Sequence, residues 1–183
     1  MKYQDLAQFR QPAGFRGRNA AIVILWWTIQ STLFSWSPQP FFRWRIFLLR
    51  MFGAKIGKNV RIRSTVRVTY PWKIKIGDNC WIGDYCDIYS LGNIELGNNV
   101  ALAHKVYLCT GNHDYTKITF DIFEKPIKIE DEAWLANDVF VGCGVTIGKG
   151  CVIGARSTVL QNMPEGMICY GYPAKPMRKR IKK

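Results

Sequence analysis

Three short stretches, "KIGKNV" (55–60), "KIGDNC" (75–80) and "ELGNNV" (95–100), recur at intervals of twenty residues in this chain of 183. A shorter period of six residues runs inside the longer one, marked each time by an aliphatic side chain. The aliphatic positions are Ile56, Ile62, Val68 and Ile74, then Ile76, Ile82, Ile88 and Ile94, then Leu96, Leu102 and Leu108, and after an interruption Ile129, Leu135, Val141, Ile147, Ile153 and Val159. Such self-similarity is typical of a repeat architecture.

A period of six fits neither an amphipathic helix nor a half-buried strand. It fits a chain that turns a corner every six residues and points the aliphatic side chain inward. The glycine that often follows is expected to give the backbone freedom near the corner. Four places after each aliphatic residue comes a smaller or β-branched one, as expected for a second inward position. These residues are Val60, Val66, Cys80, Cys86, Val100, Val106, Val139, Val145 and Cys151.

Three sides of six residues close one triangular coil, and stacked coils bury each other's edges. The interval of twenty residues is then one coil with two residues inserted at a corner. Cys80, Cys86 and Cys151 accordingly fill the smaller inward position as hydrophobic side chains. We therefore predict a mainly β protein that folds as a parallel β solenoid.

The pattern I-G-x-x-V-x, repeated over residues 56–179, resembles the hexapeptide-repeat acyltransferases. The resemblance implies a left-handed parallel β-helix, although crossovers between parallel strands are otherwise right-handed. It also implies three parts: an N-terminal helical segment (1–54), a β-helix domain (55–164) with a projecting loop (109–128), and a basic C-terminal segment (165–183).

Basic residues outnumber acidic ones by 26 to 13, which gives a formal net charge of +13. The excess indicates an anionic partner, such as a phosphorylated small molecule, a membrane surface or nucleic acid. The charge gathers at the two ends of the chain, including the tail "PAKPMRKRIKK" (173–183), which argues against a general nucleic-acid binder. The six cysteines include no C-x-x-C pair and no secretory signal opens the chain, so we expect reduced thiols, no zinc site and a cytoplasmic protein.

The six-residue period stops after Leu108 and resumes near Ile127 or Ile129. The segment between, "CTGNHDYTKITFDIFEKP" (109–126), is too polar and aromatic for another coil, and long loops in compact solenoids are commonly functional. It contains His113, one of only two histidines. An imidazole titrates near neutrality and can take a proton from a hydroxyl group; the alternative is a loop histidine that only bonds to the backbone.

The stretch "TGNHDYTK" (110–117), followed by residues 125–159, looks like the galactoside, maltose and exopolysaccharide O-acetyltransferases, whose catalytic base occupies the corresponding loop. The resemblance implies that His113 deprotonates a sugar hydroxyl, which attacks acetyl-CoA directly. It gives no such role to His104, which we expect to face outward or to line the acceptor pocket. Cys109 and Cys143 lie near the interruption but have no motif context for an acyl-enzyme nucleophile.

The segment "GARSTVLQNMPEGMICYGYPAKPMRKR" (154–180) resembles the closing part of the same family. It implies that Lys175 and Arg178 bind the phosphates of CoA, for which cationic side chains are suited. Asn137 and Ala155 correspond to backbone positions along the pantetheine arm, and Trp134 to an aromatic wall beside the base. The alternatives are a solvated basic tail and, for Trp134, simple packing.

The chain as a whole looks most like the colanic-acid type of exopolysaccharide acetyltransferase. That resemblance implies a sugar within a polysaccharide repeat unit as the acceptor. Asp87, Tyr89, Asp114 and Tyr115 are the candidates to line the acceptor pocket. N-acetylation of an amino sugar and a noncatalytic β-helix scaffold remain alternative functions. A γ-type carbonic anhydrase on this fold needs three zinc-binding histidines, whereas this chain has two.

The amino-terminal part contains two apolar stretches. The first, "NAAIVILWWTIQSTLFSW" (19–36), is interrupted by polar residues and is marginal as a bilayer span. The second, "PFFRWRIFLLRMFG" (40–53), carries Arg43 and Arg50 on one helical face. Two alternatives follow: helices that cover the open edge of the first coil as a cap, or an interfacial element with aromatic and arginine anchors at a membrane surface.

The loop over residues 109–126 bears more apolar side chain than an isolated exposed loop should display. The residues concerned are Tyr115, Ile118, Phe120, Ile122 and Phe123. A neighbouring prism would bury them, and three prisms around one axis would give three equivalent clefts. We therefore expect a homotrimer, as the resemblance also implies, in which each site needs two chains.

Overall fold

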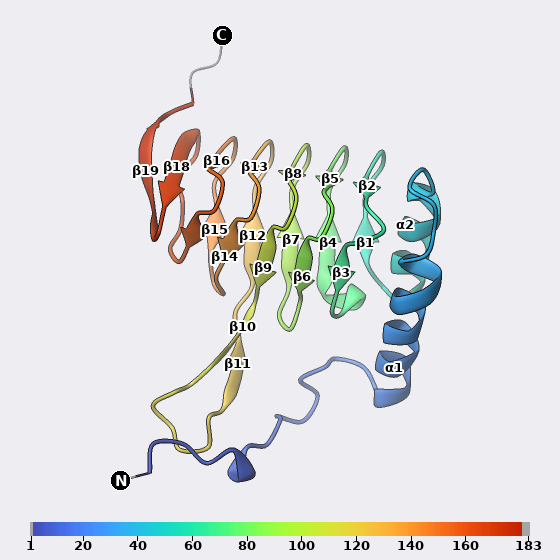
Figure 1. The fold of residues 1–183 in the computed structure, drawn as a ribbon, viewed down its shortest axis with the longest axis vertical. Helices are drawn as coiled ribbons and strands as arrows, with labels where there is room; N and C mark the ends of the chain where they lie inside the picture. The colour runs from blue at the N-terminus through green and yellow to red at the C-terminus, as the bar shows by residue number, and fades with distance from the viewer. Residues whose placement is uncertain (1, 181–183) are drawn as a thin grey trace.

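The computed structural model describes residues 2–180 and shows a β solenoid with helices across one end and a hairpin projecting from one side (Figure 1). The helical elements are α1 (Ala20–Ile29), the π-helical turn η2 (Gln30–Phe34) that continues it, α2 (Phe42–Met51), and the short 3-10 turns η1 (Leu6–Gln8) and η3 (Pro71–Lys73). The hairpin consists of β10 (Gly111–His113) and β11 (Ile122–Glu124).

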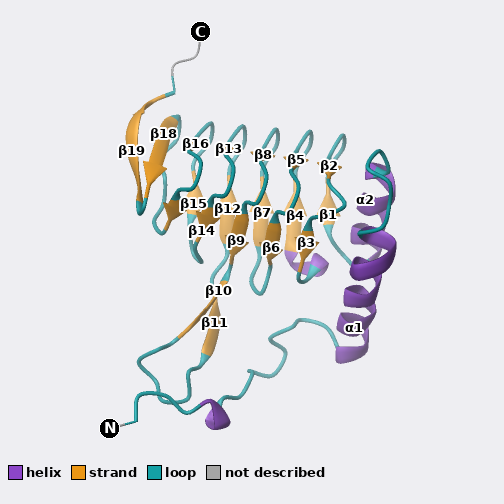
Figure 2. Cartoon of the chain, in the orientation of Figure 1, coloured by secondary structure: helices purple, strands orange, loops and turns teal. Residues whose placement is uncertain are grey.

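The remaining strands form the three flat faces of a triangular prism (Figure 2). Face A contains β1 (Lys55–Ile56), β4 (Ile74–Ile76), β7 (Ile94–Leu96), β12 (Ile127–Ile129) and β15 (Thr146–Ile147). Face B contains β2 (Arg61–Ile62), β5 (Trp81–Ile82), β8 (Ala101–Leu102), β13 (Trp134–Leu135), β16 (Val152–Ile153), β18 (Met167–Gly171) and the antiparallel β19 (Ala174–Lys179). Face C contains β3 (Arg67–Val68), β6 (Asp87–Tyr89), β9 (Tyr107–Cys109), β14 (Phe140–Val141) and β17 (Thr158–Val159).

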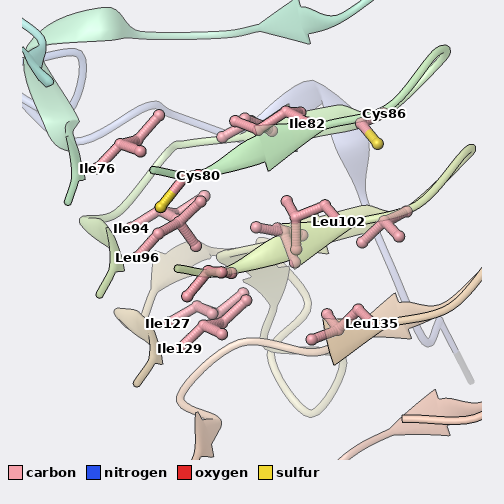
Figure 3. Close-up of a cluster of buried hydrophobic side chains, with 14 of the residues drawn as sticks. Ile76, Cys80, Ile82, Cys86, Ile94, Leu96, Leu102, Ile127, Ile129 and Leu135 are labelled. Atoms are coloured by element: carbon pink, nitrogen blue, oxygen red, sulfur yellow. The ribbon is translucent and has the colours of Figure 1, made fainter. Parts of the chain in front are cut away.

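Successive coils stack in register, so equivalent positions of the repeat lie above one another. On face A, for example, Ile76 pairs with Ile56 on one side and with Leu96 on the other. Every aliphatic position of the six-residue period is buried, and so is every small residue four places later. Figure 3 shows these side chains meeting in the interior of the prism. The core predicted from the period is confirmed.

The glycines of the repeat act differently from our prediction. A Cβ atom added to Gly77 would lie 2.6 Å from the carbonyl oxygen of Gly97 in the next coil. One added to Gly83 would lie 2.7 Å from the carbonyl oxygen of Ala103. Neither glycine has a positive φ, so conformational freedom is not what requires it. The prediction was wrong because these positions need the absence of a side chain, which lets the backbones of adjacent coils approach closely.

The left-handed conformation occurs two residues further on, at the corner between faces A and B. Asn59, Asn79 and Asn99 have φ values of 54°, 57° and 57°. Asparagine tolerates this conformation better than most residues because its short polar side chain can bond locally. The side-chain amide of Asn59 donates to Oδ1 of Asn79 at 3.1 Å, which links neighbouring corners.

The corner between faces C and A accommodates the two inserted residues. The Ser90 hydroxyl accepts from the N–H of Tyr70 at 2.8 Å and donates to its carbonyl at 3.0 Å. One coil later the Thr110 hydroxyl donates to the carbonyl of Tyr89 at 2.7 Å and accepts from the N–H of Gly92 at 2.8 Å. The hairpin leaves the prism directly after Thr110. It is therefore an enlarged form of a corner that already carries an insertion.

The helices cover the first coil of the solenoid. The Trp26 indole donates to the carbonyl of Val68 at 2.8 Å. Arg45 is fully buried and donates through Nε to the carbonyl of Ile62 at 2.7 Å, while its other nitrogens bond to carbonyls of the turn before α2. These contacts close the open end of the prism, as a cap does. Within residues 2–180, no helix has the length and apolar character needed to cross a bilayer.

Candidate active site

His113 ends strand β10, on the hairpin that leaves the corner between faces C and A. The two strands pair over three residues, with His113 opposite Ile122. Beyond them, the Asp114 carboxylate accepts from the N–H of Thr116 at 3.0 Å and from its hydroxyl at 2.6 Å, which closes a local turn. The projecting loop predicted around His113 is thus an ordered hairpin.

A backbone carbonyl determines which nitrogen of His113 is available. Nδ1 of His113 lies 2.8 Å from the carbonyl oxygen of Phe120. A carbonyl oxygen can only accept, so Nδ1 carries the proton in the neutral ring, and Nε2 keeps its lone pair. This arrangement is the one a general base needs.

Two phenylalanines hold the imidazole. The Phe120 ring stacks on it at 4.2 Å between centroids with an interplanar angle of 9°. The Phe9 ring lies 5.8 Å from it, tilted by 53°. Phe9 is brought there by the N-terminal segment, which bonds to the hairpin through the Asp5 N–H and the carbonyl of Ile118 at 2.7 Å.

Sequence reasoning missed both phenylalanines. Phe120 has a φ of 50°, uncommon for a bulky residue, and such strain is found mainly at functional sites. The contacts of Phe120 and Phe9 with His113 have no sequence signal, because the loop and the N-terminal segment are both aperiodic. Phe9 is also more than a hundred positions away from His113 in the chain.

The donor-side residues lie on face B and at its edge. Its register places one residue of each strand in a single outward row: Arg61, Trp81, Ala101, Trp134, Val152, Ile168 and Arg178. Trp81 and Trp134 are 58% and 47% exposed and flank the small Ala101. The Arg61 guanidinium lies over the Trp81 ring at 5.3 Å. The two tryptophans, with His104 at one edge, line a groove of about 360 Å³.

The corner between faces B and C carries a ladder of bonds from side chains to backbone. Nδ1 of His104 accepts from the N–H of Asp84 at 3.0 Å, and Oδ1 of Asn137 accepts from the N–H of His104 at 3.1 Å. The next coil has Ala155 at this position, as the strand register shows. Alanine has no side-chain oxygen, so the ladder ends there and leaves the N–H of Asn137 facing a position without an acceptor.

The same ladder explains why His104 differs from His113. Its Nδ1 lone pair is occupied by the Asp84 N–H, which leaves Nε2 to carry the proton in the neutral ring. Asp84 lies one coil before His104. Burial alone would raise the pKa of the Asp84 carboxyl group, but hydrogen bonds from Arg63 and Thr65 lower this pKa and keep the carboxylate charged. His104 is exposed, which agrees with the first of its two predicted positions, and it lines the groove on face B rather than the groove of Asp87 and Tyr89.

The two predicted phosphate ligands belong to β19. Lys175 pairs with Tyr170 and Arg178 pairs with Ile168 of β18. Both side chains are exposed. This part of the chain is a strand of face B rather than a loose tail, so the two cations extend the surface that carries Trp134.

The four predicted acceptor residues fall into two pairs. Asp87 and Tyr89 line a groove of about 750 Å³ between face C and the helices, together with Arg67 and Tyr107. Burial raises the pKa of Asp87, and the charge of Arg67 partly offsets this. The other pair, Asp114 and Tyr115, lies on the hairpin. Tyr89 lies at the base of the hairpin, where Gly111 approaches it.

Within one chain, His113 and the donor-side residues are on opposite sides of the prism. The hairpin leaves from the corner between faces C and A, and face B is the side opposite that corner. Figure 1 shows the hairpin extending away from β5, β8 and β13. The buried core separates His113 from Trp134 on face B.

Two cysteines of the core are unsuited to nucleophilic chemistry. Burial raises the pKa of the Cys86 and Cys151 thiols to about 12, so these groups stay protonated near neutral pH. All six cysteines are free thiols. Between residues 2 and 180, no three His, Cys, Asp or Glu side chains gather in a form that could hold a metal ion.

Comparison with known protein families matches the solenoid twice. Residues 126–161 match the family described as bacterial transferase hexapeptide (six repeats), and residues 73–108 match the hexapeptide repeat of succinyl-transferase. Among solved structures, the hexapeptide-repeat acetyltransferase VCA0836 of Vibrio cholerae, complexed with acetyl coenzyme A, has a TM-score of 0.82 over 91% of this chain and 92% of its own, at 24% identity. That likeness shows the fold.

Two curated relatives extend the match along the chain. The putative colanic acid biosynthesis acetyltransferase WcaF of Escherichia coli is 53% identical over 178 residues, which are 97% of this chain and 98% of the relative. The galactoside O-acetyltransferase of E. coli is 30% identical over 134 residues, covering 72% of this chain and 66% of the relative. The predicted left-handed parallel β-helix and enzyme class are confirmed. The chain belongs to the hexapeptide-repeat acyltransferases, the family that includes the colanic acid type of acetyltransferase.

Proposed function

We propose that this enzyme transfers an acetyl group from acetyl-CoA to a sugar hydroxyl within a polysaccharide repeat unit, with His113 as the general base. The observation that carries the proposal is the bond from Nδ1 of His113 to the Phe120 carbonyl, which leaves Nε2 free to accept a proton. The names of the E. coli relatives support sugar acetylation. The acetyl coenzyme A in the Vibrio complex supports the donor.

The donor fits the outer surface of face B and the adjoining corner. A pantetheine arm carries amide carbonyls, which the N–H groups of Asn137 and Ala155 can meet. Trp134 offers an apolar wall beside this path. Lys175 and Arg178 supply positive charge for the pyrophosphate and 3′-phosphate, and we assign residues 165–183 to donor binding on this basis.

Acetyl-CoA, when bound, supplies a thioester with an electrophilic acetyl carbon. Nε2 of His113 takes the proton of the acceptor hydroxyl as the oxygen forms the new ester bond and the carbon–sulfur bond breaks. The imidazolium then returns this proton to the departing thiolate. The Phe120 carbonyl holds Nδ1–H throughout and stabilises the positive charge on the ring.

The acceptor class predicts a specific product. We propose that Asp87, Tyr89, Asp114 and Tyr115 line the acceptor pocket, because carboxylates and aromatic rings suit sugar hydroxyls and ring faces. Incubation with acetyl-CoA and oligosaccharide repeat units should give a product one acetyl group heavier by mass spectrometry, with release of one CoA thiol. Mild alkali should remove the acetyl group, since it is an ester.

Free galactosides and amino sugars are the matched controls for this experiment. An alkali-stable acetyl group on an amino sugar would replace the proposal with N-acetylation. If no acceptor increased the rate of CoA thiol release above the rate measured without an acceptor, the result would favour the noncatalytic scaffold.

We further propose that each site is shared between two chains of a homotrimer. The support is the separation of His113 from face B across the core of a single prism. The apolar loop residues support assembly less than we expected, because Phe120 packs on His113 and Ile122 packs against the buried cluster of Val23, Tyr70 and Leu91 within the chain. Three chains around one axis would give three equivalent sites.

Mixing two inactive variants tests this sharing. One variant carries His113→Ala, and the other carries Lys175→Glu with Arg178→Glu and is assayed at low acetyl-CoA. Coexpressed in equal amounts, they should recover about a quarter of the wild-type rate, because a random trimer pairs an intact base with an intact donor surface in a quarter of its sites. If the mixtures were no more active than the separate variants, the base and the donor surface would belong to one chain. The same would follow if light scattering showed a monomer that had full activity.

A further inference from the structure

The outer surface of the helices at the end of the prism is apolar and uncovered. We call this surface the helical layer; it comprises α1, η2 and α2 (20–51). Its inner side chains are buried against the first coil. Its exposed apolar side chains are Ile24, Leu25, Trp27, Leu33, Trp36, Phe41, Trp44, Phe47 and Met51. Trp36 and Phe47, 81% and 51% exposed, line a groove of about 740 Å³ across the layer.

Helix α1 has no charged residue and is apolar around its whole circumference. A helix of this composition is normally covered on all sides. The prism covers only the side that carries Val23 and Trp26. The cap contacts therefore bury one side of the helix, whereas Ile24, Leu25 and Trp27 stay exposed among the residues that the structure describes.

The charge around the helical layer has one sign. Residues 20–51 contain no aspartate or glutamate, and their three charged residues are Arg43, Arg45 and Arg50, of which Arg45 is buried. Arg43 lines the groove beside Trp36 and is exposed. It forms no ion pair within residues 2–180. Such a surface is complementary to an anionic one.

The position of the layer suits a flat partner. The helices lie across the end of the solenoid, at the opposite end from β18 and β19 (Figure 1). Nothing else described in the chain projects beyond them at this end. An apolar side with tryptophans and a bordering arginine has the composition of an element that lies in the interface of a bilayer.

We propose that the outer surface of the helical layer binds the surface of an anionic lipid bilayer. Trp36, Phe47 and their apolar neighbours enter the boundary between headgroups and acyl chains, and Arg43 pairs with lipid phosphates. The cap and the interfacial element, posed above as alternatives, are then the two sides of one layer. The proposal does not depend on the acceptor or on His113.

Sedimentation with phosphatidylcholine vesicles, with and without phosphatidylglycerol, tests this proposal. The enzyme should bind the vesicles that contain phosphatidylglycerol. Arg43→Gln should weaken that binding about fivefold, the effect of one cation near an anionic surface. Trp36→Gln combined with Phe47→Gln should weaken it about tenfold or more, because the apolar contact is lost. Circular dichroism should be unchanged, since all three side chains are exposed.

Matched controls at the other end of the solenoid show whether the effect is specific to the layer. Leu160→Gln removes a 60% exposed apolar side chain at the other end of the solenoid, and Lys149→Gln removes an exposed cation there. Both should bind vesicles like the wild type, and so should His113→Ala. Lipids that carry bromine in their acyl chains should quench the tryptophan emission of the wild type. They should quench the emission of the Trp36→Gln, Phe47→Gln variant much less.

Three results would overturn the proposal. Equal binding by the layer variants and the controls would show that the layer does not make the contact with the vesicles. Binding without quenching would mean that no aromatic side chain enters the bilayer. A change of oligomeric state in the layer variants, without any vesicle binding by the wild type, would show that a second copy of the chain covers the layer instead.

Discussion

Replacing His113 with alanine is expected to lower kcat by ~10²–10⁴-fold while leaving the KM for acetyl-CoA and the melting temperature nearly unchanged. The reason is that only proton transfer is lost. The imidazole lies on the hairpin, between Phe120 and Phe9, and fills no position in the buried core. Steady-state kinetics with a glycan acceptor and saturating acetyl-CoA measure the effect.

His104→Ala is the matched control, because His104 is the only other histidine. Its Nδ1 already accepts from the Asp84 N–H, so its removal should affect kcat far less than removal of His113. Its position in the groove on face B allows a moderate rise in the KM for acetyl-CoA. Equal losses of kcat in the two variants would mean that the base has been assigned to the wrong imidazole.

Gly77→Ala is expected to have the largest effect on stability. The added methyl group would lie 2.6 Å from the carbonyl oxygen and 2.7 Å from the carbonyl carbon of Gly97, both backbone atoms of the next coil. The coils must separate locally to accommodate it, at a cost of about 3 kcal/mol in the free energy of unfolding. For a chain of this size that corresponds to a fall in Tm of roughly 6–12 °C by calorimetry.

Gly142→Ala is the control, because Gly142 also follows an aliphatic residue of the period. Its added methyl group would meet only Cδ2 of Leu160, the end of a flexible side chain, at 3.3 Å, with the nearest backbone atom at 3.5 Å. We expect a change within about 0.5 kcal/mol. If both variants melted at the same temperature, close approach of the coils would not be the reason for glycine at these positions.

The candidate site was only partly predictable from the sequence. His113 could be found because it interrupts a strict period and matches a family motif. Phe120 and Phe9 could not, because a stacked ring depends on the path of an aperiodic loop and of a separate N-terminal segment. The role of Gly77 was also mistaken, since a single coil does not reveal how closely the next one approaches.

What the sequence by itself determined was the interior of the prism. The aliphatic residue and the small residue four places later repeat with every side, so each coil specifies its own inward positions. Only the tertiary structure decided how the outward residues are grouped. Stacking in register aligns Trp81, Trp134 and Arg178 in one row although they are far apart in the chain. It also places His113 on the opposite side, because the corner that carries the insertion faces away from that row. Positions within a coil follow from local periodicity, whereas the separation of base and donor surface follows from how the coils close into a triangle.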